Sequence, residues 1–216
     1  MDIEFAHRQM VEQQVRTGDV NEPSVLAAIA AVEREQFVPA PFRHLAYADT
    51  EIPLAHGQRM MTPIVEGRLL QALALSGDDR VLEVGTGSGY LTACLARLAG
   101  TVVSIDIFED FVAGASQTLD AAGVGNASLS CMDACAALPE EEFDAIAVTG
   151  SLPGFDDRYL TRLKTGGRLF LIVGRSPVME GRLVVRESGA EWSSTALFET
   201  DIRPLINAVT PSTFAF

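Results

Sequence analysis

The feature that most constrains the fold of this 216-residue chain is a glycine-rich turn between an apolar strand and a helix. It reads Val-Leu-Glu-Val-Gly-Thr-Gly-Ser-Gly-Tyr over residues 81–90. Glycine has no Cβ, so it adopts backbone angles that are closed to other residues and lets a ligand lie against the main chain. The amide groups at the start of the following helix lie beside such a turn. The segment therefore predicts a nucleotide-binding strand, turn and helix.

The spacing of the glycines indicates which nucleotide the turn binds. A dinucleotide fingerprint would place its third glycine at position 90, but Tyr90 stands there and the third glycine is Gly89. Glu83 would repel a pyrophosphate, whereas it would attract an ammonium or a sulfonium group. The pattern favours S-adenosylmethionine over NAD as the cofactor.

A second β-branched strand, residues 101–106, ends in an acid. Asp106 follows Gly85 by 21 residues, and an acid at this place can accept hydrogen bonds from both ribose hydroxyls of a nucleotide. The alternative interpretation of Asp106 is a solvated charge at a strand end. The order of strand, glycine turn, helix, second strand and acid favours the ribose contact.

Composition agrees with a single domain over residues 1–216, because a chain that is 48% hydrophobic and 21% charged can bury one full core. The spacing of apolar residues changes near residue 80, from a helical pattern to alternating strands and helices. We expect an N-terminal helical and substrate-loop segment over residues 1–76 and a cofactor-binding α/β core over residues 77–216.

Charge and cysteine content exclude several classes of partner and site. A net charge of −13 disfavours nucleic acids and anionic membranes as partners and leaves a small molecule, peptide or protein as substrate. The three cysteines include no C-x-x-C pair, so we expect neither a disulfide framework nor a zinc site or other metal centre. The first residues lack a signal-peptide core, and no apolar run is long enough to span a bilayer. We expect a cytoplasmic protein; the sequence does not indicate its oligomeric state.

The pattern of the C-terminal part predicts the fold class. Strands are expected near 80–84, 101–106, 127–131, 143–148 and 167–173, with helices near 88–99, 109–122 and 156–164. This alternation predicts a doubly wound, mostly parallel, Rossmann-like sheet that is covered on both faces. Residues 182–186 and 194–198 predict an antiparallel hairpin at the sheet edge.

Two helices are expected in the N-terminal part. One covers residues 24–32, with Asn21 as its N-cap, and the other starts at Thr62-Pro63 and ends near Leu75. The stretch between them, residues 37–61, is expected to be irregular.

Several segments, in order, resemble one family. They are Met10–Val15, Arg34–Pro39, His44–Asp49, His56–Gln58, the glycine turn, Phe143–Thr149 and Lys164–Arg168. Over about residues 8–174 the chain resembles the protein-L-isoaspartate O-methyltransferases. The resemblance implies the class I methyltransferase fold, S-adenosylmethionine as cofactor, and methylation of a carboxylate on isoaspartyl residues of a peptide or protein, which starts their repair.

The resemblance also implies roles for individual residues. Around the methionine end of the cofactor it places Glu83, Gly85, Thr86, Gly87 and Ser88. It places Asp106 at the ribose and Asp133 at the adenine. The family usually flanks the adenine acid with glycines, whereas this chain has Met132 and Ala134, and the alternative for Asp133 is a loop acid that caps the following helix.

The substrate loop departs from the family. Where the family usually reads Gly-Gln-Thr-Ile-Ser-x-Pro, this chain reads Gly-Gln-Arg-Met-Met-Thr-Pro over residues 57–63. Met61 therefore replaces a serine hydroxyl with a thioether, which donates no hydrogen bond. Thr62 offers a hydroxyl one position later, though a helix cap also explains it. Arg59, in place of threonine, can pair bidentately with a carboxylate or can be a solvated loop charge.

A carboxylate acceptor with a pKa of about 4 is ionised at neutral pH, so the reaction needs no general base. His56 is a candidate for an additional polar contact, or a structural loop residue. Two alternatives to repair activity stay open: a methyltransferase of this fold with another acceptor, and a non-catalytic cofactor-binding module.

Overall fold

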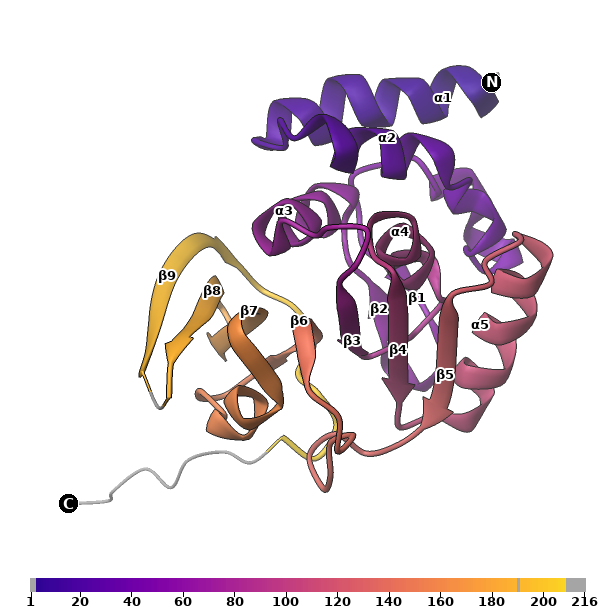
Figure 1. Cartoon of the computed structure of the whole chain (residues 1–216). Helices are drawn as coiled ribbons and strands as arrows, with labels where there is room; N and C mark the ends of the chain where they lie inside the picture. The colour runs from indigo at the N-terminus through magenta and orange to yellow at the C-terminus, as the bar shows by residue number, and fades with distance from the viewer. Residues whose placement is uncertain (1–2, 190, 209–216) are drawn as a thin grey trace.

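In the computed structural model, which describes residues 3–189 and 191–208, the described residues form a seven-stranded sheet with the order β5-β4-β3-β6-β7-β8-β9 (Figure 1). The strands are β3 (Arg80–Val84), β4 (Thr101–Asp106), β5 (Ala127–Cys131), β6 (Phe143–Leu152), β7 (Leu163–Arg175), β8 (Val178–Ser188) and β9 (Glu191–Thr200). The strands β5, β4, β3, β6 and β7 are parallel to one another. The strands β8 and β9 extend the sheet as antiparallel neighbours. The predicted mostly parallel sheet with an antiparallel edge hairpin is confirmed.

Helices cover one face of this sheet. The α-helices are α1 (Ile3–Gln9), α2 (Pro23–Ala31), α3 (Pro63–Leu73), α4 (Tyr90–Leu98) and α5 (Glu109–Ala121). The shorter turns are η1 (Met10–Val15), η2 (Arg16–Gly18), η3 (Arg34–Gln36), η4 (Ala40–Leu45) and η5 (Ala55–Gly57). Side chains alternate along a strand, so Val81 packs with α2, α3 and α4 while Leu82 packs in a second core on the opposite face.

The second face of the sheet has no α-helix over it among the described residues. Ala134, Leu138 and Tyr159 cover it from a loop and from the 3₁₀-helix η6 (Asp157–Arg162). The predicted helix over residues 156–164 is therefore wrong. Leu163 already pairs with Phe143 as the first residue of β7, which leaves six residues, too few for a stable α-helix.

The predicted N-cap of helix α2 is wrong. Asn21 does not cap α2, because the helix begins at Pro23 and its N-cap is Glu22, with no side-chain cap bond. Instead, the side-chain oxygen of Gln71 on α3 accepts from the backbone amides of Asn21 and Glu22, at 2.6 and 2.9 Å. A neighbouring helix thus satisfies donors that a local side chain usually satisfies.

The start of α3 follows the expectation. Thr62 Oγ1 accepts from the Val65 amide at 3.4 Å and Pro63 occupies the first helical turn. Before it, two short strands, β1 (Ile52–Pro53) and β2 (Arg59–Met60), pair antiparallel and order part of the stretch expected to be irregular. The helices found among the described residues are all too short or too polar to cross a membrane.

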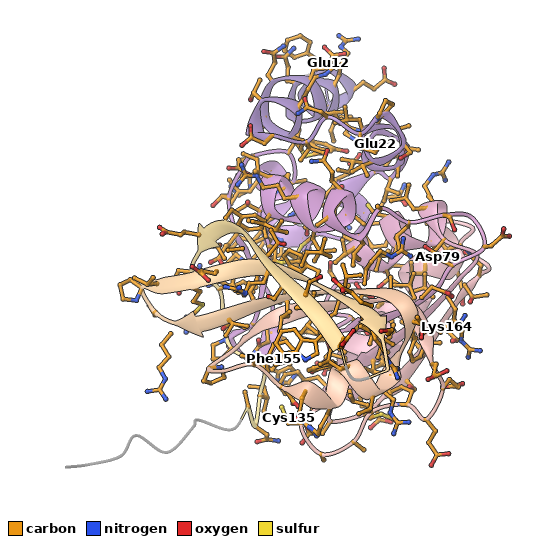
Figure 2. All side chains as sticks on the ribbon, turned by 60° about the vertical axis from the view of Figure 1, so that its left-hand side comes forward. Glu12, Glu22, Asp79, Cys135, Phe155 and Lys164 are labelled. Carbon is orange, nitrogen blue, oxygen red and sulfur yellow. The ribbon has the colours of Figure 1, made fainter. Side chains whose placement is uncertain are left out.

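The N-terminal helices lie far from the carboxyl ends of the parallel strands. Figure 2 shows Glu12 and Glu22 at one end of the molecule and Cys135, which follows β5, near the other. Cys135 lines a pocket at the carboxyl ends of these strands. Cys94, Cys131 and Cys135 are all free thiols.

Candidate active site

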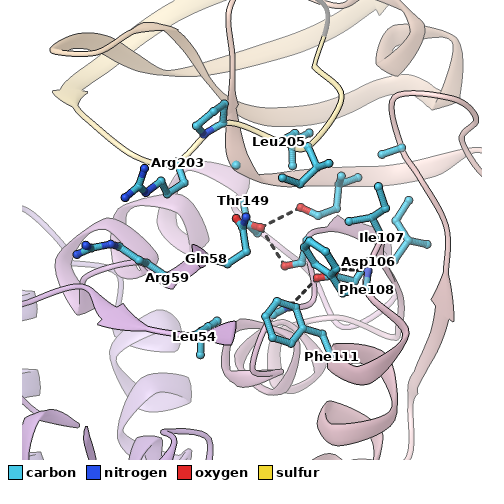
Figure 3. A pocket seen from close by; sticks show the side chains of 18 of the residues that line it. Leu54, Gln58, Arg59, Asp106, Ile107, Phe108, Phe111, Thr149, Arg203 and Leu205 are labelled. Carbon is cyan, nitrogen blue, oxygen red and sulfur yellow. Dashed lines mark hydrogen bonds between the residues drawn. The ribbon is translucent and has the colours of Figure 1, made fainter. Parts of the chain in front are cut away.

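One pocket, termed the main pocket for its position, lies at the carboxyl ends of β3, β4 and β6, where the chain order of the strands reverses direction (Figure 3). Ligands of open α/β sheets bind at this kind of switch point. The pocket encloses about 780 Å³, part of it open to solvent. Its walls come from the glycine turn, from residues 105–111 and 132–135, from the loop before α3, and from residues 202–206.

The glycine turn fits closely against β6. Gly85 has a φ of +100°, and a Cβ at this position would lie 2.2 Å from Thr149 Oγ1. That hydroxyl lies 2.9 Å from the carbonyl oxygens of both Val84 and Gly85, to which it donates. Only glycine is compatible with both the backbone angle and the space, so the turn presents bare main chain to the pocket.

Asp106 ends β4 beside this turn and lines the pocket. Its two carboxylate oxygens accept from the backbone amides of Gly87, at 2.9 Å, and Phe108, at 3.0 Å. Burial raises the pKa of Asp106 above its usual value, and these two hydrogen bonds oppose the rise. Each oxygen keeps a lone pair, so the carboxylate can still accept from a ribose hydroxyl.

A sealed polar network supports the turn from below. Thr86 and Ser104 hydroxyls lie 2.6 Å apart, and Ser104 donates to Glu83 at 2.6 Å. Thr92 on α4 donates to the same Glu83 oxygen. Burial raises the pKa of Glu83 to about 8. Glu83 is fully buried and absent from the pocket lining, so it lies beneath the turn.

The turn residues Gly85 to Ser88 also line a smaller pocket of about 340 Å³. Thr86 is almost fully buried there, and Ser88 Oγ accepts from the Tyr90 amide at 3.4 Å. Met60 and Met61 face the same pocket from the loop before α3. Both pockets include the glycine turn and the loop before α3 in their linings, so the smaller pocket continues the main pocket along the turn.

Beneath the smaller pocket is a buried ion pair that sequence analysis missed. Arg34 is fully buried, contacts Glu66, and donates to the Met61 carbonyl at 2.8 Å. Its guanidinium carbon lies 4.7 Å from the centre of the Tyr90 ring. Burial raises the pKa of Glu66 to about 7, and Arg34 opposes the rise. The pair fixes the Met61 backbone in the pocket wall.

Asp133 lines the main pocket, as Asp106 does. One of its oxygens accepts from the Cys135 amide at 2.8 Å and the other from the Asn207 side chain at 2.9 Å. No α-helix follows it in the described chain, so helix capping is not its role. Its bonds close a turn and tether the C-terminal segment to the sheet.

His56 lies outside the pocket. Its Nε2 is 2.9 Å from both carboxylate oxygens of Asp110, and its ring stacks on Phe108 with centroids 4.0 Å apart. The hydrogen bond from His56 lowers the pKa of Asp110 below its usual value. This contact fastens the loop before α3 to α5, and it supports the structural interpretation of His56.

Of the three predicted catalytic residues, only Arg59 lines the pocket. Arg59 is exposed on β2 and lies 3.3 Å from Glu51. Thr62 uses its hydroxyl as the α3 cap and does not line the pocket. Met61, in place of the family serine, is buried in the pocket wall.

Sequence analysis missed two further parts of the wall. Phe108 and Phe111 form an apolar side near Asp106 (Figure 3). Residues 202–206 form another side, because Ser151 exchanges backbone hydrogen bonds with Arg203 and Leu205, both at 2.9 Å. The position of the two phenylalanines, within five residues after Asp106, could have indicated that they line the pocket. The C-terminal segment has no local motif that could have indicated this.

The sequence and the fold are similar to those of one family of known proteins. Residues 5–207 match the family model of Protein-L-isoaspartate(D-aspartate) O-methyltransferase. A protein-L-isoaspartate O-methyltransferase 2 of Pelobacter propionicus is 37% identical over 95% of this chain and 92% of its own length. A protein-L-isoaspartate O-methyltransferase 1 of Rhodopseudomonas palustris is 40% identical over 77% of this chain and 68% of its own.

Solved structures share the fold. A putative protein-L-isoaspartate O-methyltransferase of Plasmodium falciparum, solved with S-adenosyl-L-homocysteine, superposes with a TM-score of 0.82 at 20% identity, covering 92% of this chain and 97% of its own. Strand order, glycine turn, strand-end acid and sequence identity agree: this chain belongs to the protein-L-isoaspartate(D-aspartate) O-methyltransferase family of S-adenosylmethionine-dependent methyltransferases.

Proposed function

We propose that this enzyme methylates a free carboxylate of a peptide or protein, with isoaspartyl residues as its acceptors. The observation that carries the proposal is the pocket itself, in which a bare glycine turn and a strand-end acid lie opposite an arginine of the substrate loop. The names of the relatives, at 33% to 40% identity, support the same acceptor.

The pocket residues fit S-adenosylmethionine. The free lone pairs of Asp106 would accept from the ribose hydroxyls, and Phe108 and Phe111 would pack against the adenine. Asp133 keeps acceptor capacity for the adenine amino group. Gly85 and Gly87 would let the methionine portion lie on the main chain. Bound in this way, the cofactor supplies an electrophilic methyl group.

The protein's task is to position the acceptor and exclude water. An isoaspartyl carboxylate has a usual pKa of about 4, so it reaches the pocket ionised and needs no base. Arg59 at the mouth can hold such an anion by two parallel hydrogen bonds. Leu54 and Met61 form an apolar wall beside it, and a dry, oriented site accounts for catalysis without further groups.

We also propose a location and a substrate class for the enzyme. The free thiols support a cytoplasmic location, and the net charge of −13 argues against a nucleic acid as substrate.

The test is methyl transfer from labelled S-adenosylmethionine to an isoaspartyl peptide, beside the same peptide with a normal aspartyl residue. We expect methylation of the isoaspartyl peptide alone. Met61 favours a second candidate, a methyltransferase for another acceptor. That candidate would replace the proposal if S-adenosylhomocysteine binds in calorimetry while neither peptide is methylated.

A further inference from the structure

A second groove continues from the acceptor side of the pocket. It encloses about 1120 Å³, open to solvent, between the end of β7 and residues 201–204. The two cavities share Glu51, Arg59, Ile202, Arg203 and Pro204. An acceptor whose carboxylate enters the pocket can therefore extend along the groove without leaving the protein surface.

Three arginines line this groove, and two of them have no acidic partner among the described residues. Arg59 has one ion pair, at 3.3 Å with Glu51. Arg175 and Arg203 are exposed, and neither has an ion pair or a side-chain hydrogen bond with any residue the structure describes. The groove acid Asp201 accepts from Ser176 at 2.8 Å.

Several other arginines of the molecule are engaged by acids, whereas some, such as Arg16, Arg43 and Arg97, have no ion pair with a described residue. The guanidinium groups of Arg80, Arg158 and Arg182 pair with Glu141, Asp156 and Glu180, respectively. The chain has 29 acidic and 16 basic residues, so acidic partners are abundant. The groove itself is lined by three arginines, Arg59, Arg175 and Arg203, and by two acids, Glu51 and Asp201, so it carries a local excess of positive charge on an acidic protein.

Figure 3 shows where this charge lies in the main pocket. Arg59 on β2 and Arg203 in the segment after β9 lie on the same side of the pocket, away from Phe108 and Ile107. The two arginines thus flank the acceptor end. No acid faces Arg203 within ion-pair distance in the described chain.

We propose that this arginine-lined groove binds the acceptor polypeptide through its acidic groups. Arg203, with Arg59, recognises the carboxylate that is methylated, and Arg175 recognises an acidic residue beside it in the acceptor sequence. The inference rests on the proposed function and specifies its substrate as polypeptide with acidic neighbours. Guanidinium groups suit carboxylates because their donors match both oxygens.

The first experiment compares isoaspartyl peptides that differ only in whether Glu, Gln or Lys flanks the isoaspartyl residue. At low ionic strength, we expect kcat/KM to fall in the order Glu, Gln, Lys, by roughly two- to fivefold a step, the size of an exposed ion pair. Higher salt should shrink the differences. Arg175→Gln should remove the preference, and Arg175→Glu should reverse it.

The matched control is Arg97→Gln, an exposed arginine on α4 outside the groove with no ion pair in the described part of the chain. It should keep the native order of the peptides. Equal kcat/KM for the three peptides with the native enzyme would overturn the inference while leaving isoaspartyl methylation intact. If no peptide is methylated, the proposed function fails and the groove assignment fails with it.

Arg203→Gln separates acceptor recognition from cofactor binding. We expect the peptide KM to rise roughly tenfold or more, and the Kd for S-adenosylhomocysteine, measured by calorimetry, to change far less. Arg203→Lys should restore part of the peptide affinity, since it keeps the charge and loses the paired donors. An equal loss of peptide and S-adenosylhomocysteine affinity would assign Arg203 to the cofactor and overturn the inference.

Discussion

The two sides of the pocket are built in different ways. The cofactor side comes largely from one stretch of the chain, Val84 to Phe111, to which Asp133 is added, and its shape depends on backbone angles and on the buried network below the turn. The acceptor side joins residues 51–61 to residues 202–206 and presents exposed side chains. A backbone-built surface tolerates little change, whereas an exposed side-chain surface can change its specificity without loss of the fold.

The largest effect is expected from Gly85→Ala, which attacks the cofactor side directly. The new Cβ would lie 2.2 Å from Thr149 Oγ1 at a φ of +100°, and the backbone strain alone costs about 1–3 kcal/mol. We expect affinity for S-adenosylhomocysteine to fall by roughly a hundredfold or more in calorimetry. Gly77→Ala, where nothing lies within 4 Å, is the control. Native affinity in Gly85→Ala would show that the turn does not form the cradle.

Asp106→Ala should have the next largest effect. The loss of a charged acceptor costs roughly 1.5–3 kcal/mol, about ten- to a hundredfold in the Kd for S-adenosylhomocysteine. Because Asp106 also accepts from Gly87 and Phe108, Asp106→Asn is needed to retain part of that support. Unchanged affinity in a folded Asp106→Ala variant, or tighter binding of NAD by the native protein, would contradict the cofactor assignment.

The sealed network predicts a dependence of stability on pH. The pKa of Glu83 is about 8 in the folded state, above its usual 4.5, so the folded state binds the proton more tightly. This contribution to stability is complete below pH 4.5 and is lost as pH rises through 8. Between pH 6 and 8.5 the free energy of unfolding of the native protein should fall. In Glu83→Gln this fall should be smaller by on the order of 1–2 kcal/mol. Parallel denaturant-derived curves for native and variant proteins would contradict it.

Met61→Ser tests the acceptor side. A hydroxyl at this buried wall position should donate to the acceptor carboxylate, as the family serine is inferred to do, and raise kcat/KM for an isoaspartyl peptide by roughly tenfold. The smaller side chain should also lower stability by about 2 kcal/mol. A slower variant with intact cofactor binding would indicate that the apolar wall itself contacts the acceptor.

The smallest effect is expected from His56→Ala. His56 lies outside the pocket and acts through its contacts with Phe108 and Asp110, so we expect kcat to change by no more than about threefold. Cofactor affinity should weaken slightly, since Phe108 loses its stacking partner. A kcat lowered by more than about fiftyfold at saturating substrates would mean that His56 contacts the acceptor directly.

The sequence anticipated the strands, the glycine turn and the strand-end acid, because their determinants are local. The glycines, Asp106 and the strand periodicity each act within a few residues of themselves, and the structure has the predicted strands and places Asp106 beside the turn. Local signals failed where a distant group competed with them. Gln71 replaced the predicted cap at Asn21, and pairing with Phe143 replaced the predicted helix that would have included Leu163.

By itself, then, the sequence determined the fold class, the glycine turn and the strand-end acid, since periodicity and backbone preference are properties of short segments. Only the tertiary structure decided which charges face the pocket. It buried Glu83 under the turn, paired Arg34 with Glu66, and brought Arg203 beside Arg59 across more than half the chain. Burial and long-range contact depend on the packing of the whole sheet, and no segment carries that information alone.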